Sequence, residues 1–275
     1  MTSQAIGYID SGIGGITVAR EALRQLPHEV VYYVGDTARM PYGPRPKEEV
    51  LKYTWEMVDF LVKKDIKMLV IACNTATAAA LPDLRAKLDI PVIGVIAPGV
   101  RGALRATNNK KIGVIATAGT VKSEAYAKAL EHKDNAVRVS QLACPEFVQI
   151  VEANQSDSPA AATLIADKLA YFADKDIDTL VLGCTHFPLL DQTIGKVMGE
   201  KVTLVNSGAV AIENVSAMLD ELNISNSDPI NRAKDEYYTT GDVTAFHTLA
   251  SRWLNNDDLN VQHLAMTSTG LKLED

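Results

Sequence analysis

Short apolar runs alternate with longer segments of helical periodicity along most of the chain. The runs are rich in Val, Ile and Leu, as buried parallel strands are. The longer segments repeat apolar residues every three or four positions. The first predicted strands are residues 5–10, 30–35, 68–73 and 92–95, and the first predicted helices are residues 15–25, 47–64 and 77–88. This alternation predicts an α/β protein with mainly parallel sheets.

A second series of the same kind follows. Its predicted strands are residues 111–116, 136–142, 179–184 and 202–205, and its predicted helices are residues 123–130, 144–153 and 159–174. The segment Ile-Gly-Tyr-Ile-Asp-Ser that starts at Ile6 resembles Ile-Gly-Val-Ile-Ala-Thr, which starts at Ile112. The apolar runs that end at Cys73 and Cys184 match at nearly the same offset. Two matches in one order predict two similar doubly wound parallel-sheet domains, related by pseudo-twofold symmetry, with the active site in the cleft between them.

The stretch after Ser207 does not fit a third domain. It contains predicted helices at residues 209–222 and 243–254 and a predicted edge strand at residues 236–240. The simplest arrangement returns these elements to the first domain. The predicted division is a first domain of residues 1–97 with 208–264, a second domain of residues 98–207, and a polar, frayed tail of residues 265–275.

Composition narrows the class of protein. The chain has 275 residues, is 47% hydrophobic and carries a net charge of -7, with an isoelectric point of about 5.3. An acidic balance argues against nucleic acid as a partner. Because no signal peptide or membrane-length apolar run is evident, we expect a cytoplasmic protein without a membrane partner. The three cysteines have neither a disulfide framework nor the spacing of a zinc site, so no metal is expected.

Cys73 and Cys184 are the last residues of equivalent predicted strands, and each precedes a predicted helix start. Ligands of open α/β sheets bind beyond the carboxyl ends of the strands, where Asp10, Asp36 and Thr117 also lie. A helix N-terminus lowers the pKa of a thiol, so either cysteine could act as a base or a nucleophile. A lone cysteine is more often a buried structural residue. The repeat favours chemistry for the pair, whereas Cys144 has no repeat partner and is expected to be structural.

Other candidate groups surround these thiols in the sequence. Asp10 opens a glycine-rich turn, but the spacing does not match a dinucleotide-binding motif and the carboxylate would repel a pyrophosphate. An ammonium ligand, or assistance to a nearby base, suits Asp10 better. His186 could carry a proton, and Glu152 is a second candidate acid, although both could equally be ordinary helix or core residues. Tyr42 lies in a rigid Pro-Tyr-Gly-Pro turn, which could also be a plain surface loop.

Taken together, four motifs resemble the cofactor-independent aspartate/glutamate racemase superfamily, and glutamate racemases in particular. They are Ile-Asp-Ser-Gly-Ile-Gly-Gly from Ile9, Gly-Asp-Thr-Ala-Arg-Met-Pro-Tyr-Gly-Pro-Arg from Gly35, Ala-Cys-Asn-Thr-Ala from Ala72 and Gly-Cys-Thr-His-Phe-Pro from Gly183. The resemblance covers nearly the whole chain. The family often has tyrosine at the position of Phe187, so one hydroxyl is missing here.

The resemblance implies racemisation of glutamate by two thiols without a cofactor. It implies Cys73 and Cys184 as the paired acid and base, assisted by Asp10 and His186 respectively, with Glu152 nearby. The substrate-binding residues that it implies are Asp10, Ser11, Tyr42, Gly43, Asn74, Thr75, Thr117, Thr185 and His186. It further implies a homodimer in a bacterial cytoplasm that supplies D-glutamate for peptidoglycan. Some members carry an N-terminal extension linked to activation by a cell-wall precursor, and we expect that control to be absent.

Alternatives to glutamate racemisation stay open on the sequence. The same scaffold could act on aspartate, maleate or an arylmalonate with one or both thiols. A two-lobed binding protein would bind a ligand without exchanging its carbon-bound proton. A redox protein would instead pair the two cysteines reversibly.

Overall fold

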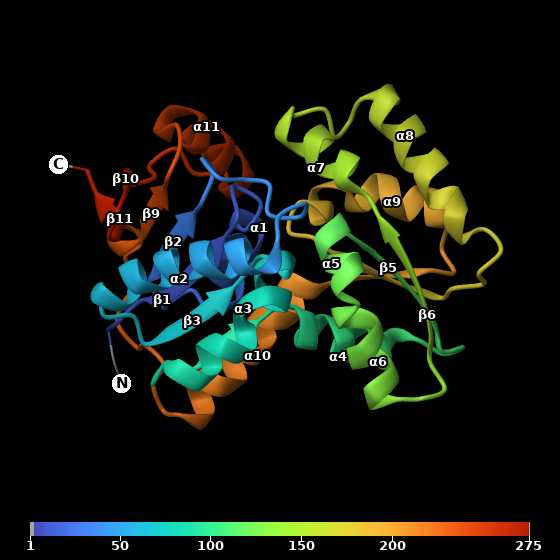
Figure 1. Cartoon of the computed structure of the whole chain (residues 1–275), viewed down its shortest axis with the longest axis horizontal. Coiled ribbons are helices and arrows are strands. Elements are labelled where there is room, and N and C mark those ends of the chain that lie inside the picture. The colour runs from blue at the N-terminus through green and yellow to red at the C-terminus, as the bar shows by residue number, and fades with distance from the viewer. Residues whose placement is uncertain (1–2, 275) are drawn as a thin grey trace.

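Two separate sheets organise the chain into two lobes in the computed structural model, which describes residues 3–274. Figure 1 shows the lobes side by side, with the N-terminus and the C-terminus both on the first. The first lobe holds a seven-stranded sheet in the order β11-β10-β9-β2-β1-β3-β4, and the second holds a four-stranded sheet in the order β6-β5-β7-β8. The predicted α/β class with two parallel-sheet domains is confirmed.

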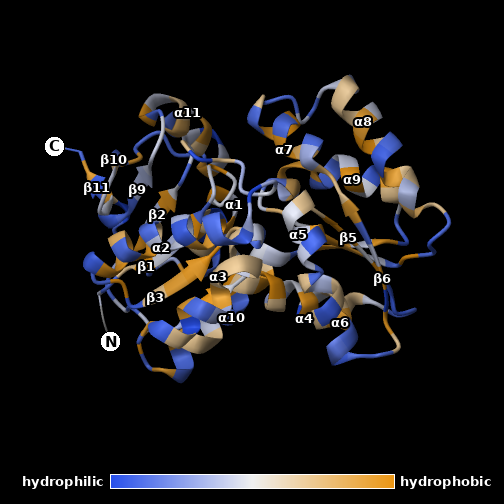
Figure 2. Ribbon diagram, in the orientation of Figure 1, coloured by the Kyte–Doolittle hydropathy of each residue, from blue (hydrophilic) through white to orange (hydrophobic). Residues whose placement is uncertain are grey.

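The first series of elements builds the core of the first lobe. It comprises β1 (Ile6–Asp10), α1 (Ile16–Gln25), β2 (Val31–Gly35), α2 (Lys47–Lys63), β3 (Met68–Ile71), α3 (Asn74–Lys87) and β4 (Val92–Gly94). All residues of β1 and β3 are buried, because helices cover both faces of the sheet. Figure 2 shows β3 as an apolar ribbon, whereas the neighbouring helix α2 carries both polar and apolar residues.

The second series builds the second lobe. It comprises α4 (Ile96–Ala106), β5 (Lys111–Ala116), α5 (Ala118–Ser123), α6 (Ala125–Lys133), β6 (Arg138–Ala143), α7 (Pro145–Glu152), α8 (Pro159–Leu169), η1 (Ala170–Phe172), β7 (Thr179–Gly183), η2 (Phe187–Leu190), α9 (Asp191–Met198) and β8 (Thr203–Asn206). Helix α4 is absent from the predicted elements, because Pro98, Gly99 and Gly102 lie within it. A Cβ at Gly99 would lie 2.9 Å from the Cβ of Ser207, so the glycine permits close packing against α10 (Ser207–Glu221).

The internal repeat corresponds to matching strand positions in the two sheets. In each lobe the first strand of the series pairs with the second and the third, and the third pairs with the fourth. Gly7 and Gly113 lie at equivalent places, where an added Cβ would meet the Cδ1 of Ile66 at 2.7 Å and that of Ile177 at 2.6 Å. Each glycine therefore allows an equivalent isoleucine side chain to pack against the backbone of a central strand.

The remaining elements extend the first lobe. They are α10, η3 (Arg232–Lys234), β9 (Glu236–Thr239), α11 (Val243–Leu254), β10 (Val261–Thr267) and β11 (Gly270–Leu273). The prediction of an edge strand at residues 236–240 is wrong, since β9 lies between β2 and β10.

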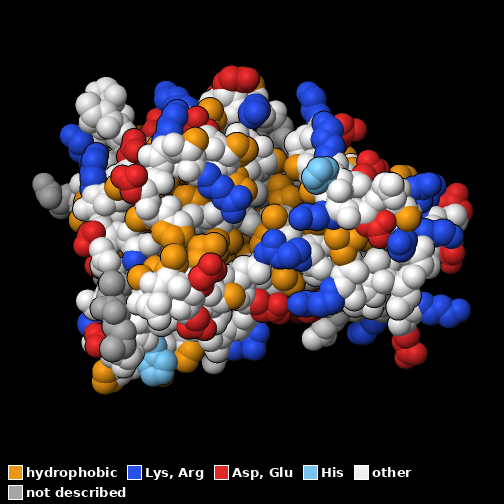
Figure 3. Space-filling model, turned by 90° about the horizontal axis from the view of Figure 1, so that it is seen from below, with side chains coloured by type: hydrophobic (Ala, Val, Ile, Leu, Met, Phe, Trp, Pro, Cys, Tyr) orange, Lys and Arg blue, Asp and Glu red, His pale blue; other side chains and the backbone are white. Residues whose placement is uncertain are grey.

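Helix α10 packs on both α1 and α4 and so lies between the lobes. Figure 3 shows hydrophobic side chains gathered near the middle of the underside.

The prediction of a frayed tail is also wrong for residues 265–274. Strands β10 and β11 form an antiparallel hairpin at the edge of the seven-stranded sheet. Leu264 and Leu271 are buried in the core cluster that α2 covers. Two buried leucines among polar neighbours hide the signal of a strand, because only alternate residues face the core. Asp275 lies outside the described residues.

Candidate active site

A pocket lies between the two lobes, at the carboxyl ends of the central strands. All the predicted site residues except Asp10 line it. The lining is Ser11, Gly12, Met40, Pro41, Tyr42, Gly43, Cys73, Asn74, Thr75, Thr117, Val148, Glu152, Cys184, Thr185 and His186. Gly12, Met40 and Pro41 adjoin predicted site residues within the same motifs. Val148 gave no signal, since it belongs to an apolar helical pattern like any other.

Cys73 lies two residues after β3 and caps α3. Its Sγ accepts a hydrogen bond from the backbone N–H of Ala76 at 3.4 Å, and its thiol donates to the Oγ of Ser11 at 3.6 Å. Burial, reinforced by the negative charge of Asp10, raises the pKa of Cys73 to about 12. The predicted lowering of the pKa by the helix N-terminus is therefore wrong for this cysteine, because desolvation of the thiolate outweighs the helix.

Cys184 has a different environment, although it directly follows the equivalent strand, β7. The prediction that a helix starts beside it is met only by the 3₁₀ helix η2, and α9 begins at Asp191. The nearest polar partner of its Sγ is the Nδ1 of His186, at 3.7 Å. The two thiols therefore share a pocket but have different neighbours.

His186 connects Cys184 to Glu152. The other ring nitrogen of His186, Nε2, lies 2.9 Å from the Oε1 of Glu152. Burial opposes the charged form of the imidazole, but the hydrogen bonds to Cys184 and Glu152 raise the pKa of His186 to about 10. The ring is therefore protonated near neutral pH and donates from both nitrogens, which places a positive charge beside the Cys184 sulfur.

Asp10 lies beneath the pocket rather than in its lining and is almost fully buried. Its carboxylate accepts hydrogen bonds from the N–H of Gly12 at 3.0 Å, the hydroxyl of Ser11 at 3.3 Å and the hydroxyl of Thr185 at 3.2 Å. Burial raises the pKa of Asp10 to about 6, although the charge of His186 acts in the opposite direction. Because Ser11 also accepts from the thiol of Cys73, Asp10 reaches that thiol through one hydroxyl.

Two glycines of the turn after β1 are explained by side chains that approach the backbone of the turn closely. A Cβ at Gly14 would lie 2.4 Å from the Cε1 of His186 and 2.5 Å from the Oγ1 of Thr185. A Cβ at Gly15 would lie 2.6 Å from the Cβ of Asp10. This turn therefore holds the two lobes in contact and has a packing role.

Uncharged polar groups complete the lining. The hydroxyl oxygens of Thr75 and Thr117 lie 2.9 Å apart across the two lobes. The hydroxyl of Tyr126 donates to the Oδ1 of Asn74 at 2.7 Å. The amide nitrogen of Asn74 is buried without a hydrogen-bond partner among residues 3–274. Because Tyr126 occupies the oxygen, Asn74 brings an unpartnered donor to the pocket lining.

Tyr42 is buried, although Pro41 and Pro44 of the same turn are exposed. Tyr42 is 1% exposed, and its hydroxyl donates to the carboxylate of Asp36. Asp36 itself does not line the pocket. The expectation that it converges with the other strand-end groups is therefore wrong, because its carboxylate turns into the first lobe.

Within residues 3–274, no three or more His, Cys, Asp or Glu side chains cluster as a metal site would require. None of the helices in that part of the chain is both long and apolar enough to cross a membrane.

Comparison with known proteins gives a consistent family. A family model described as Asp/Glu/Hydantoin racemase matches residues 16–215. A glutamate racemase of Carnobacterium sp. (strain St2) is 54% identical over 267 residues, which are 97% of this chain and 100% of that protein. A glutamate racemase of Listeria monocytogenes serotype 4a is 55% identical over 263 residues, which are 96% of this chain and 98% of that protein.

Solved structures agree with the sequence relatives. The glutamate racemase isoform RacE1 from Bacillus anthracis has a TM-score of 0.91 at 43% identity, over 96% of this chain and 98% of that one. A glutamate racemase from Francisella tularensis, solved with D-glutamate, has a TM-score of 0.88 at 31% identity, over 96% of this chain and 98% of that one.

The fold, the site and these matches place the chain in the aspartate/glutamate racemase family. It is an amino-acid racemase, an isomerase. Within the family, the relatives that match it over nearly its whole length are glutamate racemases.

Proposed function

We propose that the protein interconverts L- and D-glutamate by a two-thiol mechanism. The observation that carries this proposal is the placement of Cys73 and Cys184 in one pocket, each at the end of an equivalent strand of its lobe. Inversion at a carbon requires a base on one face and an acid on the opposite face. Two similar lobes that face each other across a pocket are suited to supply one group each.

We infer the starting forms of the two thiols from their different neighbours. The protonated His186 stabilises negative charge on the Sγ of Cys184, whereas Cys73 stays a neutral thiol in its buried site. In one direction the Cys184 thiolate removes the α-proton, and the electron pair stays on the substrate as a carbanion. The Cys73 thiol then gives its proton to the opposite face and becomes the thiolate.

The reverse direction starts from the forms that the first direction leaves, with Cys73 as the thiolate and Cys184 as the thiol. The Cys73 thiolate removes the α-proton, and the Cys184 thiol gives its proton to the opposite face and becomes the thiolate again. We assign to Asp10 the role of assisting Cys73, which it reaches through the hydroxyl of Ser11, and to His186 that of assisting Cys184. Glu152 holds the imidazole of His186 in the orientation that this assistance requires.

The polar lining fits an amino acid with two carboxylates. The free amide donor of Asn74 and the hydroxyls of Thr75 and Thr117 supply hydrogen bonds to carboxylate oxygens. We assign Tyr42, Gly43 and Thr185 to substrate binding, since they line the same pocket. Fixed donors around the developing charge lower the barrier to forming the carbanion. That the substrate is glutamate is inferred from the relatives, one of which was solved with D-glutamate.

The test is proton exchange at the substrate carbon. The purified protein, dialysed against a chelator and without added pyridoxal phosphate, is incubated in D₂O with either enantiomer of glutamate. We expect the optical rotation to decay to zero from both sides, with deuterium incorporated at Cα. Binding without exchange would identify a binding protein instead, and turnover of aspartate, maleate or an arylmalonate but not glutamate would identify a related enzyme.

We further propose that the protein acts in a bacterial cytoplasm as a homodimer and supplies D-glutamate for peptidoglycan. The support is the bacterial origin of the relatives, which are glutamate racemases. Deletion of the gene in its host should then create a requirement for D-glutamate. Sedimentation of the purified protein should give about twice the mass of one chain.

A further inference from the structure

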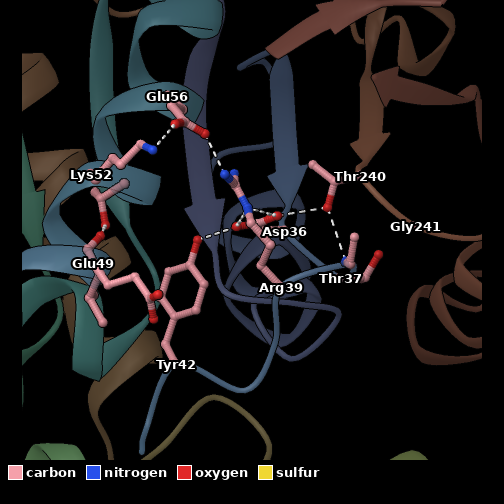
Figure 4. Close-up of polar contacts among 12 residues, drawn as sticks. Asp36, Thr37, Arg39, Tyr42, Glu49, Lys52, Glu56, Thr240 and Gly241 are labelled. Carbon is pink, nitrogen blue, oxygen red and sulfur yellow. Dashed lines mark hydrogen bonds and ion pairs between the residues drawn. The ribbon is translucent and has the colours of Figure 1, made fainter. Parts of the chain in front are cut away.

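The segment between β2 and α2 carries part of the pocket lining. Residues 36–45, here called the 36–45 loop, bring Met40, Pro41, Tyr42 and Gly43 to the pocket. The base of the loop is the carboxylate of Asp36, which is fully buried. Figure 4 shows Arg39 and Tyr42 of the loop and Thr240 converging on this carboxylate, with Glu56 on the far side of Arg39.

Arg39 fastens the loop to α2. Its Nε donates to both carboxylate oxygens of Asp36, at 2.7 and 3.0 Å. Its Nη1 donates to the carboxylate of Glu56. The guanidinium also lies over the ring of Tyr53, 4.1 Å from the ring centroid. Because α2 carries both Glu56 and Tyr53, Arg39 connects the loop to the body of the first lobe.

Thr240 fastens the loop to the end of β9. Its hydroxyl donates to Asp36 at 2.7 Å and accepts from the backbone N–H of Ala38 at 3.0 Å. The backbone carbonyl of Thr240 lies 3.2 Å from the Nε2 of His263 in β10. Strands β9 and β10 have no counterpart in the four-stranded sheet of the second lobe. The extra strands of the first lobe therefore bring a hydroxyl to the base of the loop.

The tip of the loop meets the second lobe. A Cβ at Gly119 in α5 would lie 2.4 Å from the carbonyl oxygen of Gly43. A Cβ at Gly43 would lie 3.1 Å from the Cβ of Thr117. With such close backbone approach, a small shift at the base of the loop would move Gly43 against the second lobe and change the pocket.

We propose that Arg39 and Thr240 are positioning residues, which hold Tyr42 and Gly43 at the place where the pocket closes on its substrate. Neither residue lines the pocket. They act through Asp36, whose carboxylate accepts four hydrogen bonds from three donor groups and is thereby held away from catalysis. The assignment of Tyr42 and Gly43 to the substrate rests on the proposed function.

The main test compares Thr240→Val with Thr240→Ser. Valine keeps the shape of the side chain but loses the hydroxyl, whereas serine keeps the hydroxyl. We expect Thr240→Val to raise KM for glutamate about tenfold, the effect of one lost hydrogen bond to a charged group, and to change kcat much less. Thr240→Ser should restore KM. Thr248→Val is the matched control, since Thr248 is exposed on α11 and bonds only within its helix.

A second readout does not depend on activity. Amide hydrogen exchange of residues 37–44 should accelerate about tenfold in Thr240→Val and in Arg39→Lys, while exchange in α11 stays unchanged. Unchanged exchange of the loop, or a KM that Thr240→Ser fails to restore, would overturn the positioning role. If the parent protein fails to racemise glutamate, the proposed function is lost, and the exchange measurement still decides the inference about the loop.

Discussion

Thr185 donates a hydrogen bond to the carboxylate of Asp10 across the two lobes, with 3.2 Å between Oγ1 and Oδ2. Thr185 directly follows Cys184 in the chain, and Asp10 contacts Ser11, the partner of Cys73. One hydrogen bond therefore joins the surroundings of the two thiols. A change in the protonation of groups around one thiol can therefore alter the surroundings of the other thiol through this contact.

Removing either thiol should slow racemisation strongly, and the two variants should differ in which enantiomer is affected more. Because a serine hydroxyl is far less acidic than a thiol, we expect Cys73→Ser and Cys184→Ser each to lower kcat by at least about 10²-fold, as loss of a general acid or base does. Each variant should lose solvent-deuterium exchange from one enantiomer more than from the other. Normal racemisation by both variants would exclude the two-thiol mechanism.

Cys144 is the matched control for these variants. It is fully buried in the core beside the second sheet and does not line the pocket. Cys144→Ala should keep kcat and lower the free energy of unfolding by about 1 kcal/mol, since it leaves a small cavity. Denaturant unfolding measures the second quantity.

The charge of His186 should depend on Glu152. The pKa of His186 is raised to about 10 by its hydrogen bonds to Cys184 and Glu152. Glu152→Gln keeps a hydrogen-bonding oxygen but removes the negative charge, so the pKa of His186 should fall by one unit or more. Titration of the imidazole by NMR measures this directly. A pKa near the ordinary value of 6.5 in the parent protein would contradict the assignment of an imidazolium.

Asp10 should make the free energy of unfolding depend on pH in an unusual direction. Its pKa is raised from 3.8 to about 6 in the folded protein, so the folded state holds this proton more tightly than the unfolded chain. The stabilisation is complete below pH 3.8 and is lost as the pH rises through about 6. In Asp10→Asn this loss of stability with rising pH should be absent, because the amide does not titrate. The stability of this variant relative to the parent should therefore rise by about 2 kcal/mol between about pH 4.5 and pH 7.5.

Gly14→Ala should separate the lobes locally. The added Cβ would lie within 2.5 Å of atoms of His186 and Thr185, so these side chains must move. We expect kcat/KM to fall about 10²-fold, as misplacement of catalytic groups by about 1 Å does, with overpacking costing about 1–3 kcal/mol of stability. Gly195→Ala is the control, since its Cβ would meet only Leu204 at an ordinary 3.7 Å.

Tyr126→Phe should affect binding more than catalysis. The variant loses only the hydroxyl that holds the Oδ1 of Asn74, so the amide can turn away from the pocket. We expect KM for glutamate to rise about fivefold, in line with one neutral hydrogen bond, while kcat changes little. An unchanged KM would show that Asn74 is held by other contacts.

Local patterns were enough to predict the framework of the molecule. Apolar runs and helical spacing predicted the strands that carry Cys73 and Cys184, because a strand buried between helices has a recognisable composition. The same patterns failed for α4, whose Pro98, Gly99 and Gly102 resemble a loop. They also failed for β11, where a single buried Leu271 holds the strand in place. In both places long-range packing outweighs the local signal.

The sequence by itself determined the α/β class, the two-lobe repeat, and which polar residues stand at the ends of strands. Only the tertiary structure decided how these residues act on one another. His186, in the turn after β7, meets Glu152 of α7, and Thr240 reaches Asp36 from about 200 residues further along the chain. The tertiary structure also determines the protonation of Cys73. Burial is a property of the packed chain, and here it raises the pKa of a thiol that its place at a helix N-terminus would have lowered.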